Sequence, residues 1–79
     1  VHTVKFHNII SEAVVSIDYA MNIVSIKCHS GLANAACAGL DMMNLSYVVG
    51  TIAGDDTIFV LTRTESDARM LTRHLKELL

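Results

Sequence analysis

The sequence predicts an α+β fold, a two-layer sandwich in which an antiparallel sheet carries its helices on one face. Two observations lead to this prediction. Segments of alternating apolar and polar residues occur in two pairs, and a short turn divides each pair. Each pair is followed by a segment whose apolar residues recur at spacings of three and four, so the predicted element order is ββαββα. The 79 residues contain no proline and no internal repeat, which indicates one continuous domain.

The first predicted element is a β-hairpin within Ala13–His29. Its two strands flank a break at 20–22, and the alternation continues on both sides of that break. The apolar positions are Ala13, Val15, Ile17, Tyr19, Val24, Ile26 and Cys28. Residues 1–12 lack a clear period, and we interpret them as a lead-in with room for one helical turn. Because the chain begins without an initiator Met, we expect this lead-in to join a missing N-terminal region to the domain at 13–79.

A slim helix is predicted over 32–44. It follows the Ser30-Gly31 break, and its apolar residues are spaced by three and four. These residues are Ala33, Ala36, Leu40 and Met43. Four alanines and Gly39 leave little side-chain bulk along the helix, so another backbone element can approach it closely.

The second half of the chain predicts a hairpin and a closing helix. Strands are expected at Tyr47–Ala53 and Thr57–Thr62, because both are rich in β-branched residues and Gly54-Asp55 between them is a hairpin turn pair. The spacing of Thr64 and Asp67 is that of a helix capping box. The apolar stripe that follows consists of Ala68, Leu71, Leu75 and Leu78.

The composition favours an oligomer. Apolar residues make up 52% of the chain and charged residues only 18%, against a usual charged share of about 25%. Two cysteines cannot supply a disulfide framework, so we expect contacts between copies to add the missing stability. With a net charge of −2 and no basic block, these residues are not expected to bind nucleic acid themselves. No apolar run is long enough for a membrane span, and we expect a cytoplasmic protein.

The acidic residues suggest a site for a cation. Asp55 and Asp56 occupy the tip of the second predicted hairpin. Asn34 and Asp41 lie seven residues apart, two helical turns, and therefore share a helix face with Ala38 between them. If this face and the hairpin tip meet, three carboxylates and an amide surround a floor of small residues. Two plainer interpretations remain open at this point, turn formation by the aspartates and a solvated helix face.

Chemistry of other kinds finds less support in the sequence. The Gly-Asp-Asp run also occurs in magnesium-binding hairpins, so a Mg²⁺-dependent enzyme using Asp41, Asp55 and Asp56 is one alternative. Four histidines and two cysteines lack the spacing of a zinc site. No nucleophile or phosphate-loop motif occurs. We therefore predict neither an enzyme nor a bound metal.

The run Gly50–Ile58, followed by an apolar strand and an amphipathic helix, resembles the C-terminal domain of bacterial arginine repressors. The resemblance extends to Gly31–Asn34, to Asp41 and to the hairpin Ala13–His29, and so covers nearly the whole chain. It implies trimers that stack into hexamers and bind L-arginine between the trimers. It also implies that a separate N-terminal winged-helix domain binds operator DNA.

The resemblance also implies which residues contact L-arginine. They are Asn34, Asp41, Thr51, Ala53, Asp55 and Asp56. The two adjacent aspartates are expected on the cationic groups, one of them reaching the guanidinium from the opposing trimer, because carboxylate–guanidinium pairing is planar and bidentate. Asp41 and Asn34 are expected near the α-amino and α-carboxylate groups, and Thr51 and Ala53 are expected to supply hydroxyl and backbone contacts.

The chain departs from the family pattern at two places. Asn34 stands where the family commonly has Gln, and His29-Ser30-Gly31 replaces the usual Pro-Gly before the helix. The first departure shortens the side chain by one methylene, so a paralogous repressor with a weak arginine response is one alternative. An amino-acid-sensing module of an enzyme is another, since the same small oligomeric fold would serve it.

Overall fold

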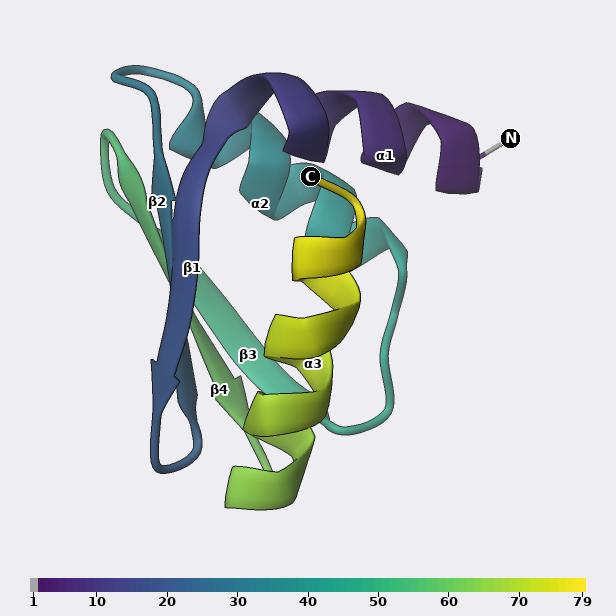
Figure 1. The fold of residues 1–79 in the computed structure, drawn as a ribbon, viewed down its shortest axis with the longest axis vertical. Helices are drawn as coiled ribbons and strands as arrows, with labels where there is room; N and C mark the ends of the chain where they lie inside the picture. Colours follow the sequence, from purple (N-terminus) through teal and green to yellow (C-terminus); the bar gives the residue numbers. More distant parts are fainter. Residues whose placement is uncertain (1) are drawn as a thin grey trace.

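A computed structural model describes the backbone of residues 2–79 and the side chains of residues 7–79 (Figure 1). The elements are α1 (His2–Ala13), β1 (Val14–Ala20), β2 (Ile23–Cys28), α2 (Ala33–Met42), β3 (Val48–Ala53), β4 (Thr57–Thr62) and α3 (Glu65–Glu77). The predicted α+β two-layer sandwich is confirmed. The sheet forms one layer, and the helices pack against one of its faces (Figure 1).

The four strands are antiparallel and lie in the order β1-β2-β4-β3. Both predicted hairpins are present, and β2 and β4 meet at the centre of the sheet. The first hairpin turns at Met21, whose φ of 53° is in the left-handed region. Because β2 and β4 are antiparallel, the β3–β4 turn lies beside the end of β2, and the β1–β2 turn lies beside the end of β4 at the opposite edge of the molecule (Figure 1).

The core lies between the central strands and the helices. Val24 pairs with Val60 and Ile26 pairs with Ile58, and all four side chains have no exposed surface. The predicted stripe of α3 covers them, with Ala68, Leu71 and Leu75 buried. The predicted cap also forms, because the Thr64 side chain accepts a hydrogen bond from the backbone N–H of Asp67.

The prediction of a single helical turn within residues 1–12 was wrong. Residues His2–Ala13 form the helix α1, which lies across α2 (Figure 1). Ile10 is 1% exposed and belongs to the core. The slim surface of α2, with Gly39 buried, admits this close packing. Contacts with α2 therefore stabilise a helix for which the local sequence pattern is weak.

The alternation predicted for the first strand fails at its start. Val14 is buried, whereas Val15 is 53% exposed. The register between β1 and β2 shifts between Val14 and Ser16, as in a β-bulge. The extra residue reverses the inward and outward positions at this end of the strand, and the expected pattern resumes at Ile17.

Candidate functional site

The predicted acidic hairpin tip is held against the start of α2. The backbone N–H groups of Gly31 and Ala33 both donate to the carbonyl oxygen of Asp55, over 3.1 and 3.4 Å. The N–H of Cys28 donates to the carbonyl oxygen of Asp56, over 2.6 Å. These bonds link the end of β2, the start of α2 and the β3–β4 turn, so the turn presents its two aspartates from a rigid support.

The two aspartates differ in their side-chain partners. Asp55 is exposed, and its Oδ2 accepts a hydrogen bond of 2.8 Å from the Ser30 hydroxyl. Asp56 has a cation beside it, because its Oδ2 lies 3.2 Å from Nζ of Lys27. Its other oxygen accepts from the Thr57 hydroxyl over 3.0 Å. The charge of Asp56 is therefore balanced within the subunit, whereas among the side chains of residues 7–79 Asp55 contacts a neutral donor and no cation.

Asp56 should titrate at a lower pH than an ordinary aspartate. The Thr57 hydroxyl hydrogen bond lowers the pKa of Asp56 most, and the Lys27 hydrogen bond and charge lower it further. A lowered pKa stabilises the fold above the unfolded-state value of about 3.9, and this contribution is lost as the pH falls through the folded-state pKa. We expect Thr57→Val and Lys27→Met each to raise the pKa of Asp56 in a carboxyl ¹³C NMR titration.

Thr57→Ser is the matched control for this measurement, because it keeps the hydroxyl and removes only a methyl group. A pKa of Asp56 that stays the same in both Thr57→Val and Lys27→Met would contradict the assigned contacts.

The third carboxylate belongs to a separate group at the other end of α2. Thr51 on β3 donates its hydroxyl proton to Oδ1 of Asp41 over 2.7 Å. The same hydroxyl accepts a hydrogen bond from Sγ of Cys37 over 3.2 Å. Thr51 faces the helix layer, because its partner Val60 on β4 is a core residue. The exposed carboxylate of Asp41 is thus held by the Thr51 hydroxyl, which lies between the sheet and α2.

The structure does not bring all the predicted residues together within one subunit. Asn34 is exposed and directly follows Ala33, beside the turn of Asp55. Asp41 lies seven residues later on α2, which corresponds to about 10 Å along the helix axis. Ala53 is half-buried at the end of β3, next to the same turn as Asp55. Within one subunit the predicted residues therefore form two separate groups, one around Asp41 and one beside the β3–β4 turn.

This separation bears on the magnesium alternative. Asp41, Asp55 and Asp56 do not converge, and among the described residues no three His, Cys, Asp or Glu side chains are placed to hold a metal ion. Cys28 and Cys37 are free cysteines, and both are buried. Burial raises the pKa of the Cys28 thiol, and the charge of Asp56 raises it further, so this thiol stays protonated at neutral pH.

Three side chains that hold the carboxylates were not predicted as site residues. They are Ser30, Lys27 and Cys37. The pairing of Lys27 with Thr57 across β2 and β4 places the lysine beside Asp56. The contact of Ser30 with Asp55 joins residues 25 positions apart. Both contacts depend on strand register, which the sequence pattern did not fix.

The sheet face opposite the helices is largely apolar and uncovered. Ile23, Ile52, Phe59 and Leu61 are between 41% and 71% exposed. Their strand pairings place them on one face: Ile23 pairs with Leu61, and Ile52 pairs with Phe59. They line a shallow hollow of about 360 Å³. We call these four residues the open sheet face.

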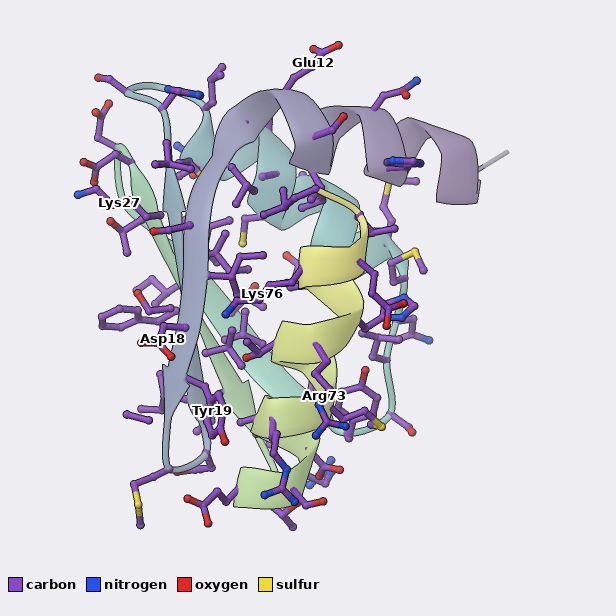
Figure 2. The ribbon with its side chains drawn as sticks, in the orientation of Figure 1. Glu12, Asp18, Tyr19, Lys27, Arg73 and Lys76 are labelled. Atoms are coloured by element: carbon purple, nitrogen blue, oxygen red, sulfur yellow. The ribbon has the colours of Figure 1, made fainter. Side chains whose placement is uncertain are left out.

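Charged side chains lie on both layers of the sandwich. Figure 2 shows Lys27 and Asp18 on the sheet, whereas Arg73 and Lys76 lie on α3.

None of the three helices between residues 2 and 79 combines the length and the apolar character needed to cross a membrane.

Comparison with known proteins places this geometry in a family. The family model described as "Arginine repressor, C-terminal domain" matches residues 10–77. The arginine repressor of Thermoanaerobacter sp. (strain X514) is 46% identical over 76 residues, which are 96% of this chain and 51% of that protein. That of Alkaliphilus oremlandii is 46% identical over 71 residues, 90% of this chain and 48% of that protein.

The arginine repressor of Clostridium novyi is 41% identical over 75 residues, which are 95% of this chain and 50% of that protein. The chain thus spans about half the length of the curated relatives that it matches. The name of the family is that of a regulator and not of an enzyme, in agreement with the prediction from the sequence. The family match and the relatives together show that the chain belongs to the arginine repressor family, as its C-terminal domain.

Proposed function

We propose that this domain assembles with copies of itself and binds L-arginine between them, as the sensor of a transcriptional regulator of arginine metabolism. The observation that carries the proposal is the separation of Asp41, near the end of α2, from Asp55, in the turn that lies beside the start of α2. Each subunit therefore holds one carboxylate at each end of this helix. An extended ligand with a cationic group at each of its own ends needs two such carboxylates, held apart from each other. Two copies facing each other can complete a site that one copy leaves in halves.

The chemistry of L-arginine fits the two halves. We assign its α-amino group to Asp41, which Thr51 holds in place. The guanidinium is assigned to Asp55 of the opposing copy, since a carboxylate can pair with it through two parallel hydrogen bonds. Asn34 and Ala53 lie beside the turn that carries Asp55 and would supply polar contacts there. Asp56 contributes less, because Lys27 already balances its charge.

Electrostatics gives this arrangement a regulatory consequence. Opposed carboxylates repel each other across an empty interface, and bound L-arginine, which has one cationic group at each end, replaces this repulsion with attraction on both sides. L-arginine then binds the assembled state better than the separated one and shifts the population toward it. We propose trimers that stack into hexamers, with the open sheet face buried between copies. A winged-helix domain upstream would bind operator DNA in the cytoplasm, its affinity increased by the multivalent array.

Sedimentation velocity of the domain tests this function. L-arginine is expected to convert trimers to hexamers, or to keep hexamers intact on dilution. L-citrulline, which keeps the shape of arginine but lacks the side-chain charge, is expected to leave the distribution unchanged. An oligomer that ignores both ligands would contradict effector binding and leave only the assembly role. A monomer under all conditions would contradict the assembly role as well.

A further inference from the structure

A buried thiol lies behind the Asp41 half of the site. Cys37 is 7% exposed and is located on the side of α2 that faces β3. Its Sγ donates to Oγ1 of Thr51 over 3.2 Å, and Thr51 in turn donates to Asp41 over 2.7 Å. The three side chains form one directed chain of hydrogen bonds from the core to an exposed carboxylate.

From this chain we propose that Cys37 is a positioning residue for the α-amino end of the arginine site. The proposal rests on the proposed function. A threonine hydroxyl has one proton to donate and can accept from other groups, and it rotates to suit its partners. With the thiol proton of Cys37 directed at Oγ1 of Thr51, the hydroxyl proton is left for Asp41. Cys37 therefore fixes the direction of a hydrogen bond that it does not itself make to the carboxylate.

The carboxylate gains a defined orientation from this contact. Oδ1 of Asp41 accepts from the Thr51 hydroxyl, and no described side chain between residues 7 and 79 contacts Oδ2, which can therefore meet an ammonium group outside the domain. A carboxylate held in one orientation loses less conformational entropy when a ligand binds. Replacing Cys37 with Ala removes the thiol donor, so Thr51 can occupy other rotamers and Asp41 is held less firmly.

The chain contains a matched control for the loss of a buried thiol. Cys28 is 3% exposed and, like Cys37, belongs to the core. No side-chain hydrogen bond joins Cys28 to the part of the chain that the structure describes. Cys28→Ala therefore reports the effect of the cavity alone, whereas Cys37→Ala adds the loss of the hydrogen bond. Cys37→Ser restores a donor at the same position.

The experiment combines ligand titrations with a measurement that needs no ligand. Isothermal titration calorimetry compares L-arginine with δ-guanidinovalerate, which lacks the α-amino group. Cys37→Ala is expected to weaken L-arginine binding about three- to tenfold, the range of one hydrogen bond. It should leave δ-guanidinovalerate binding unchanged, and Cys37→Ser should restore most of the affinity. Three-bond couplings to the Thr51 methyl group in NMR should report one χ1 rotamer in the wild type and in Cys37→Ser, and averaged rotamers in Cys37→Ala.

Several outcomes would overturn the proposal. Equal weakening of both ligands in Cys37→Ala, or the same weakening of L-arginine in Cys28→Ala, would make the thiol a packing residue only. Unchanged Thr51 couplings in Cys37→Ala would refute the positioning role directly. If the wild-type domain binds neither ligand, the proposed function fails. The couplings still decide in that case whether Cys37 fixes Thr51.

Discussion

Replacing Asp55 with Asn is expected to weaken L-arginine binding by about 30-fold or more, because removing one charge of a desolvated charged pair costs about 2–5 kcal/mol. Asn keeps an oxygen that can accept from the Ser30 hydroxyl, so the turn should keep its shape. Asp56→Asn should cost much less, since that charge is already paired with Lys27. Isothermal titration calorimetry of the assembled domain measures both changes.

Glu65→Gln is the matched control for charge. Glu65 is an exposed carboxylate in the first turn of α3, at the opposite end of the molecule from the β3–β4 turn (Figure 1). The Glu65→Gln substitution removes the same single negative charge and should leave the affinity for L-arginine unchanged. Unchanged affinity in Asp55→Asn, or equal losses in Asp55→Asn and Glu65→Gln, would rule out a direct contact between Asp55 and the guanidinium.

The parts of the fold that were predicted correctly are those specified by local sequence. Both hairpins follow from period-two alternation and turn residues, and α3 follows from the Thr64 cap and its apolar stripe. The helix α1 was missed because its stability depends on the burial of Ile10 against other elements. The bulge between Val14 and Ser16 was missed for a related reason: the first strand is apolar at 13, 14 and 15, and only pairing with β2 decides which of these residues face inward.

The site shows the same division between local and distant information. The acidic residues stand out in the sequence because turn and helix spacing are local properties. Their partners Ser30 and Lys27 come from a loop and a strand that only the β2–β4 register brings to the turn. The distribution of the carboxylates over both ends of α2 follows from the helix rise. The residue types could thus be predicted from the sequence, whereas their separation into two groups, one at each end of α2, depends on the tertiary structure.

The open sheet face accounts for the apolar excess that the composition showed. In a two-layer sandwich one sheet face has no helices to cover it, and such faces on monomers usually carry polar residues. Here Ile23, Ile52, Phe59 and Leu61 occupy it. Contiguous exposed apolar surface of this kind marks an interaction site. We propose a second copy of the same chain as the partner, because a small domain gains stability from such contacts.

Phe59→Glu is therefore expected to separate the assembly into folded monomers. Phe59 is 51% exposed in the single subunit, so the glutamate stays hydrated there, but assembly would bury an unpaired carboxylate at a cost of several kcal/mol. We expect the concentration for half-assembly, measured by sedimentation velocity, to rise by at least ~100-fold. L-arginine binding should fall with it, because each site needs two copies. Met70→Glu on α3, where Met70 is 49% exposed, is the matched control and should assemble normally. Normal assembly of Phe59→Glu, with dissociation of Met70→Glu, would place the interface on the helix layer instead.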